Sequence, residues 1–165
     1  MTTHTDDTRT DARATEVPVR LNWSQHAPEV YKAMIRLETV ARRGLDPALY
    51  ELVKIRASQL NHCAFCLDMH LASARENGEA EQRLDLLAAW EEAGDLFDGR
   101  ERAALALTEA VTVLTGGFVP DAVYEEAAAH FDDGRLAHLI GLITVINSWN
   151  RLMVGRRIPP GGWTP

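Results

Sequence analysis

Apolar residues recur every three or four positions along almost the whole chain, and this helical period restricts the fold more than any other feature of the sequence. Strand-like alternation and hairpin dipeptides are absent from the sequence. Helix starts and stops separate the periodic segments, such as the cap Asp46-Pro47 and the C-terminal signal Asn77-Gly78. The pattern predicts an all-α, single-domain bundle of about six to seven helices. The expected helices cover residues 27–43, 47–60, 63–76, 80–93, 98–114, 120–131 and 133–153.

The last expected helix has an apolar surface that is broader than one stripe. A helix of this kind is buried by more than one neighbour or lies at a subunit interface. Asn150 and Arg151 near its end are therefore expected to serve helix packing or an interface rather than chemistry. The apolar positions are Leu136, Leu139, Ile140, Ile143, Val145, Ile146, Trp149, Leu152 and Met153.

The length of 165 residues and the hydrophobic content of 46% fit one domain with its own core. Residues 1–16 are rich in Thr, Asp and Arg, so we expect a disordered tail there and a helical domain over 17–165. The tail lacks the apolar run of a signal peptide, and its aspartates argue against a transit peptide. No apolar run reaches membrane-spanning length. Trp163, at the end of an irregular segment, is expected to pack against another surface.

The charge balance and the cysteine content restrict the partners and the compartment. The formal net charge of −7, with no clustering of Lys and Arg, argues against nucleic-acid binding and favours a small or neutral partner. The only two cysteines lie three residues apart, and such a small loop would stabilise a secreted fold little. We therefore expect a soluble protein of the reducing cytoplasm.

These two cysteines and a histidine form the candidate active site. Cys63 and Cys66 are neighbours by the three-residue rule of helices, and His70 follows Cys66 by the four-residue rule. The amide N–H groups at a helix N-terminus favour a thiolate, and an imidazole one turn away can accept or relay its proton. The spacing therefore predicts an activated thiol at Cys66, with Cys63 close enough to form a disulfide.

Glu51 is the candidate carboxylate of the same site, provided that the chain turns at Asn61-His62. In one unbroken helix its distance from Cys63 would be about 18 Å. A sharp turn would make the flanking helices antiparallel and bring Glu51 to within about a turn of His70. The carboxylate could then orient and polarise the imidazole, which completes a relay of Cys66, His70 and Glu51.

Peroxide reduction is the chemistry that such a relay supports. The Cys66 thiolate attacks the O–O bond and becomes a sulfenic acid, which then condenses with Cys63 to a disulfide. A dithiol donor, of protein or lipoyl type, must reduce this disulfide. The scheme requires no organic cofactor and no metal.

The sequence resembles the alkylhydroperoxidase D and carboxymuconolactone decarboxylase-like family. The shared pattern is a glutamate, eleven intervening residues, Cys-x-x-Cys, three more residues and a histidine, which falls here on Glu51, Cys63, Cys66 and His70. The stretch Asn147 to Leu152 is also similar to the C-terminal helix of one branch of the family. The resemblance covers roughly residues 23–153.

This resemblance implies an all-helical subunit that assembles into homo-oligomers, trimers or hexamers, with peroxidase activity in the members that carry both cysteines. In those members the second cysteine, here Cys66, carries the sulfenic acid, whereas the first, here Cys63, is more exposed and exchanges with the reductant. The glutamate and the histidine serve as the proton relay. The best-known peroxidases have a histidine between the cysteines, where this chain has Phe65. Whether His62 takes that part is left open by the sequence.

Other interpretations of the same residues remain open. The two thiols with His70 and either His62 or Glu51 could hold zinc, and the thiols could also be inert core residues. Glu51 could instead pair with Lys54 or Arg56 on its own helix. We assign no chemistry to the remaining histidines that have no comparable neighbours, namely His26, His130 and His138.

Two other functions also fit the sequence. One is a decarboxylase or other lyase that acts on a small lactone or acid, as the family name suggests, although such an enzyme has no use for two thiols. The other is a non-enzymatic redox sensor, in which the disulfide alters assembly. Antioxidant reduction of alkyl hydroperoxides is the function that the sequence favours.

Overall fold

The computed structural model describes residues 18–161 and confirms the all-α class, since no strand occurs within that range. The disordered tail expected at 1–16 and the packing expected for Trp163 lie outside the described residues. Three short 3-10 helices, Leu87–Glu92, Gly94–Leu96 and Leu114–Gly116, follow or join the main helices. The α-helices are α1 (Trp23–His26), α2 (Pro28–Ala41), α3 (Pro47–Leu60), α4 (Ala64–Glu76), α5 (Glu81–Leu86), α6 (Gly99–Thr112), α7 (Asp121–His130) and α8 (Asp133–Arg156).

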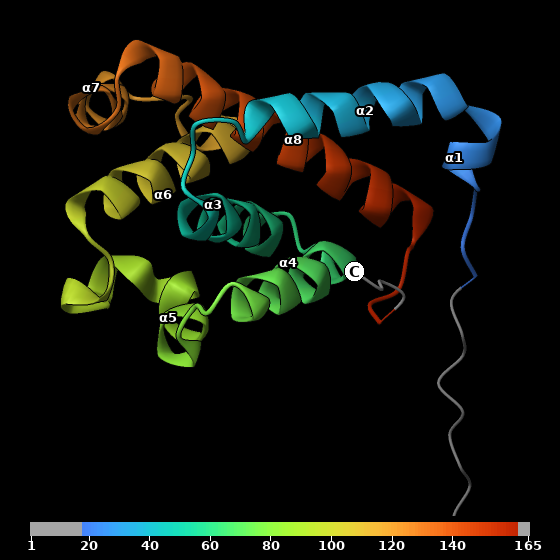
Figure 1. Cartoon of the computed structure of the whole chain (residues 1–165), viewed down its shortest axis with the longest axis horizontal. Helices are drawn as coiled ribbons and strands as arrows, with labels where there is room; N and C mark the ends of the chain where they lie inside the picture. The colour runs from blue at the N-terminus through green and yellow to red at the C-terminus, as the bar shows by residue number, and fades with distance from the viewer. Residues whose placement is uncertain (1–17, 162–165) are drawn as a thin grey trace, which may run out of the picture.

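Helix α3 lies at the centre of the bundle and contacts α4, α6 and α8 (Figure 1). Its side chains Leu52, Val53 and Ile55 are fully buried. Helix α8 packs against α2, α3, α4 and α6, which confirms that its broad apolar surface is buried by more than one neighbour. The candidate site residues on α3 and α4 are therefore held by the best-packed part of the protein.

Two apolar cores lie on either side of α3. The first joins α2, α3, α6, α7 and α8 through residues such as Leu107 and Leu139, and the second joins α3 to α4, α5 and α6 through residues such as Leu87 and Leu105. Truncation of one such buried leucine to alanine typically costs about 2–5 kcal/mol. Because α3 contributes to both cores, its position is fixed from both sides.

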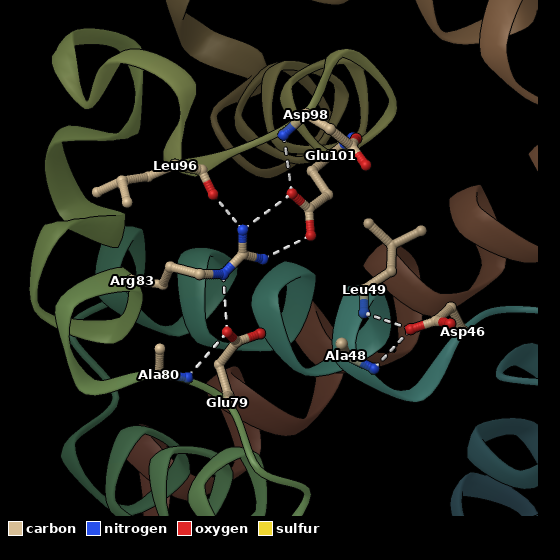
Figure 2. Close-up of polar contacts among 9 residues, drawn as sticks. All are labelled: Asp46, Ala48, Leu49, Glu79, Ala80, Arg83, Leu96, Asp98 and Glu101. Carbon is tan, nitrogen blue, oxygen red and sulfur yellow. Dashed lines mark hydrogen bonds and ion pairs between the residues drawn. The ribbon is translucent and has the colours of Figure 1, made fainter.

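Aspartates begin three of the long helices, as the sequence predicts. Asp46 accepts hydrogen bonds from the backbone N–H groups of Ala48 and Leu49 at the start of α3 (Figure 2). Asp98 and Glu101 form a reciprocal capping box at the start of α6, and Asp132 caps α8 through the amide of Arg135. Each such cap contributes about 1 kcal/mol.

The continuous helix expected over 80–93 is wrong, because the α-helix ends at Leu86 and a 3-10 helix follows. Ala89 has non-helical backbone angles inside that segment. The guanidinium of Arg102 on α6 donates to the carbonyl oxygens of Trp90 and Glu91 at 3.1 and 3.0 Å, so α6 satisfies carbonyls that have no intrahelical partner at the end of such a helix. The segment is thus held in part by a residue of another helix, which the local helical period does not reveal.

Arg83 on α5 joins the segment that follows α5 to α6 by hydrogen bonds (Figure 2). Its guanidinium donates to Glu79, to both carboxylate oxygens of Glu101 and to the carbonyl oxygen of Leu96. It also lies 4.9 Å from the ring centroid of Phe97, which is a cation–π distance. The hydrogen bond to Glu101 raises the pKa of the Arg83 guanidinium above its ordinary value.

Across residues 18–161, no helix combines the length and the apolar character needed to cross a membrane. The longest helix, α8, carries two asparagines and two arginines along its C-terminal half.

Candidate active site

A tight turn after α3 folds α4 back alongside it, as predicted for Asn61-His62 (Figure 1). His62 adopts a left-handed backbone conformation with a φ of 52°. The side-chain amide of Asn61 donates to the carbonyl of Ala57 and to the amide oxygens of Asn147 and Asn150 on α8. The turn is therefore anchored to α8 by hydrogen bonds in addition to its own backbone.

This turn brings Glu51 and His70 into contact. A hydrogen bond of 2.9 Å joins Glu51 Oε2 to His70 Nδ1, and the two residues are only 5% and 6% exposed. An ionised carboxylate only accepts hydrogen bonds, so Nδ1 is the donor and Nε2 is the nitrogen left for another partner. The approach of Glu51 to His70 that the sequence predicts is confirmed.

Cys63 and Cys66 are joined by a disulfide at the start of α4. Cys63 is the N-cap residue rather than part of the helix, and its Sγ accepts the backbone N–H of Cys66 at 3.4 Å. The helix-terminal amide that the sequence analysis assigned to Cys66 therefore points at the sulfur of Cys63. The physical reason is that the side chain of an N-cap residue reaches the free N–H groups of the first turn.

Both cysteines are 1% exposed, so the expected greater exposure of Cys63 is wrong for this subunit. Together with Met153 they form a small apolar cluster against which Phe65, Leu152 and Ile158 pack. These packed residues cover the two cysteines, and the cover includes the segment that follows α8, which returns to α4 (Figure 1). The amide of Gly161 in this segment donates to Asp68 on α4 at 2.8 Å. This cover could not be predicted from the spacing of the cysteines.

A cavity of about 620 Å³ opens beside the disulfide, and Glu51, Cys66 and His70 all line it. Among the described residues, Cys63 is not part of this lining. Much of the remaining wall is apolar or aromatic, which is typical of pockets for small organic molecules. These wall residues include Tyr31, Ile35, Phe65, Met69, Trp149 and Met153.

An ion pair that was not predicted from the sequence lies in the same wall, between Lys54 on α3 and Glu38 on α2. Lys54 is 3% exposed, and the other oxygen of Glu38 accepts the indole N–H of Trp149 at 3.0 Å. The suggested pairing of Glu51 with Lys54 or Arg56 is therefore wrong. The signal that could have revealed it is the position of Lys54 between apolar residues of a buried helix, where a charge needs a partner.

Asn150 has the packing role that the sequence predicts. Asn150 is fully buried outside the cavity lining, where it accepts from Asn61 and donates to Ser58 at 2.9 Å. Arg151 donates to the backbone and side-chain oxygens of Asn147. The bonds of Asn150 join α8 to α3 and to the turn that follows it, whereas those of Arg151 lie within α8.

The zinc alternative finds no support in this geometry. Over the described part of the chain, no group of three or more His, Cys, Asp or Glu side chains is placed to hold a metal ion. His62 is exposed and does not belong to the cavity lining. His130 pairs with Glu126 on the surface of α7, at 3.2 Å.

Together, the helical bundle and the site define an alkylhydroperoxidase D-like protein with a disulfide-bonded Cys63–Cys66 pair. Residues 28–110 match the Carboxymuconolactone decarboxylase family. This chain belongs to that family, as its similarity to known proteins also shows.

Three similar proteins illustrate the relationship. The uncharacterized protein YdfG of Bacillus subtilis is 40% identical over 82% of this chain and 92% of its own length. A crystal structure of an Agrobacterium tumefaciens protein of unknown function, ascribed to antioxidant defence as AhpD, has a TM-score of 0.83 and 36% identity over 88% of this chain and 99% of that one. An alkyl hydroperoxide reductase AhpD of Solibacter usitatus is 36% identical over 30% of this chain and 28% of its own length.

Proposed function

We propose that this protein is an antioxidant thiol peroxidase that reduces organic hydroperoxides through Cys66 and Cys63. The observation that carries the proposal is that Cys66 lines the same cavity as the hydrogen-bonded pair of Glu51 and His70. A nucleophile, a base and a residue that orients the base are the parts of an activated thiol site.

In the oxidative half-reaction, the Cys66 thiolate attacks the terminal oxygen of the hydroperoxide. An S–O bond forms, the O–O bond breaks, and the alcohol oxygen leaves with the bonding electron pair. His70 takes the thiol proton at Nε2 beforehand and returns it to the leaving oxygen, while Glu51 stabilises the imidazolium through Nδ1. The products are an alcohol and the sulfenic acid of Cys66.

In the second step, the thiolate of Cys63 attacks the Cys66 sulfur and displaces the oxygen as water, which gives the observed Cys63–Cys66 pairing. A dithiol donor of protein or lipoyl type supplies the two electrons that regenerate both thiols. The net reaction converts one hydroperoxide and one external dithiol into an alcohol, water and a disulfide. The protein is expected to carry out this cycle in the reducing cytoplasm.

Two further observations fit the proposal. The apolar and aromatic cavity wall suits the organic part of an alkyl hydroperoxide. Helix α2 also exposes Val30, Leu37 and Val40 on one side, which fits assembly of the subunit into a homo-oligomer, a trimer or hexamer.

The decarboxylase chemistry in the family's name is the alternative enzymatic function. A lyase acting on a small lactone or acid has no step that consumes thiols, whereas both cysteines of this chain are paired beside the cavity. The non-enzymatic redox sensor is the other alternative, and it differs from the peroxidase in lacking sustained turnover.

Thiol titration of the reduced protein before and after addition of cumene hydroperoxide tests the proposal. We expect loss of both thiols per subunit and steady turnover when a dithiol is supplied. Cys66→Ser should abolish the reaction, and Cys63→Ser should leave a sulfenic acid that dimedone traps. Unchanged thiol consumption in Cys66→Ser would refute the assignment, and stoichiometric oxidation with no turnover would favour the sensor.

A further inference from the structure

We infer that Glu38, held by Trp149, is a positioning residue that binds the buried ammonium of Lys54 and thereby keeps Glu51 available to His70. This inference deepens the proposed function, because it assigns residues outside the Cys-x-x-Cys motif to the control of its proton relay.

Two oppositely charged residues of α3, Glu51 and Lys54, each pair with a residue of another helix. Glu51 and Lys54 lie three residues apart on one helix and both line the cavity, which is a spacing at which opposite charges form ion pairs. The structure nevertheless pairs Glu51 with His70 on α4 and Lys54 with Glu38 on α2. The carboxylate of Glu51 therefore has two competing cationic partners, of which only one is useful to the thiol.

Trp149 holds Glu38 in the position from which it binds Lys54. Its indole N–H donates to Glu38 Oε2, while Glu38 Oε1 bonds the ammonium of Lys54. The Trp149 ring is itself held edge-on by Trp23 and Tyr31, with ring centroids 6.3 and 5.8 Å away. Glu38 is thus oriented by a rigid aromatic cluster from α1, α2 and α8.

Burial makes the competition consequential. An ammonium that is 3% exposed cannot remain without a counter-charge, because burial of an unpaired charge is strongly unfavourable. If Glu38 loses its charge, Glu51 is the remaining carboxylate on the same helix face and in the same cavity wall. Capture of Glu51 by Lys54 would take it from His70 Nδ1, and the imidazole would lose both its orientation and its charge stabilisation.

This scheme makes a prediction that neither a structural nor a directly catalytic lysine would make. Glu38→Gln should impair the thiol, whereas the double variant Glu38→Gln with Lys54→Met should restore it, since no ammonium remains to compete for Glu51. A lysine needed for its own charge would make the double variant at least as slow as the single one. A purely structural ion pair would affect folding without changing the protonation of Cys66.

Iodoacetamide alkylation of Cys66 in a Cys63→Ser background measures this effect without any peroxide. We expect Glu38→Gln to slow alkylation by about tenfold or more, toward the rate of Glu51→Gln. The double variant should return to within about threefold of the parent rate. A downfield imidazole N–H resonance of His70 should weaken in Glu38→Gln and reappear in the double variant.

Glu109→Gln is the matched control. Glu109 also binds one cation of α3, Arg56 at 2.8 Å, and one indole N–H, that of Trp90 at 2.6 Å, but it does not line the cavity. It should leave the alkylation rate unchanged. Equal slowing by Glu109→Gln would overturn the inference, because general loosening of α3 would then explain the effect.

Parent-like alkylation of Glu38→Gln, or a double variant as slow as the single one, would also overturn it. If Glu38→Gln does not fold, Glu38→Asp provides the same comparison, because it keeps the charge but withdraws it from Lys54 by one methylene. Failure of the protein to consume hydroperoxide would refute the proposed function alone, since alkylation reports the relay independently.

Discussion

Glu51 and His70 belong to different helices, yet a 2.9 Å hydrogen bond joins Oε2 of the first to Nδ1 of the second in a buried wall of the cavity. The bond exists because the turn at Asn61-His62 folds α4 onto α3. It fixes which imidazole nitrogen faces the rest of the cavity and supplies the negative charge that an imidazolium needs.

Glu51→Gln should therefore slow the reaction of Cys66 with a hydroperoxide. We expect the rate to decrease by about tenfold to a hundredfold. This is smaller than the full effect of a proton-transfer group, because Glu51 acts through His70. Stopped-flow measurement of the single-turnover rate checks it, with the melting temperature as a control for folding. A variant that folds normally and reacts at the wild-type rate would remove Glu51 from the relay.

The cover over Cys63 should control how fast external thiols reduce the disulfide. Asp68→Ala removes the acceptor of the Gly161 amide, and one such hydrogen bond contributes about 1 kcal/mol. The state in which the segment after α8 has moved away from the disulfide should therefore become about fivefold more populated. The rate of reduction by dithiothreitol should rise accordingly, and Ile158→Ala, which thins the apolar cover, should raise it as well.

Glu76→Ala is the control for this experiment, because it removes another exposed carboxylate from the same helix. It should leave the reduction rate unchanged. Identical rates for the wild type, Asp68→Ala and Ile158→Ala would mean that the donor reaches the disulfide from the cavity side, through Cys66.

The pairing of Glu51 with His70 could be predicted from the sequence because it depends on local signals. A turn signal at Asn61-His62 separates two segments of helical period, and the spacing then brings the carboxylate opposite the imidazole. The aspartate caps of α3 and α6 are equally local. Local signals of this kind therefore give the helices and the core of the site.

Features that depend on distant partners could not be predicted. Lys54 pairs with Glu38, 16 residues earlier, and the sequence does not specify how the helix of Glu38 packs against that of Lys54. The 3-10 segment that contains Ala89 is bound at the carbonyl of Trp90 by Arg102, which belongs to another helix, α6. The burial of Cys63 depends on Ile158 and on the segment after α8.

The pH dependence of stability should carry a contribution from Tyr50. Burial raises the pKa of its phenol, with the negative charge of Glu51 as the next cause. A raised folded-state pKa means that the unfolded chain loses its proton first, so stability should be lost as the pH rises past the ordinary value of about 10. Tyr50→Phe removes this contribution and should lose less stability between about pH 9 and pH 11.

Urea denaturation at both pH values measures this difference. The wild-type midpoint should fall more steeply with pH than that of Tyr50→Phe. Parallel decreases in the two proteins would show that the phenol is solvated enough to titrate equally in the folded and unfolded states.

Arg83→Met should destabilise the fold without reaching the site. The substitution leaves the carboxylates of Glu79 and Glu101, which are 9% and 16% exposed in their side chains, without their cation, and it frees the carbonyl of Leu96. We expect a loss of about 2 kcal/mol, less than for a fully buried pair because Arg83 itself is partly solvated.

The change should lower the melting temperature by about 4–8 °C for a chain of this length. Arg135→Met, which removes an exposed pair with Asp132, is the comparison and should cost no more than about 0.5 kcal/mol. Because Arg83 lies outside the cavity lining, the rate at which folded Arg83→Met reacts with hydroperoxide should match the wild type. Equal melting temperatures for the two arginine variants would show that the contacts of Arg83 add nothing beyond an ordinary surface ion pair.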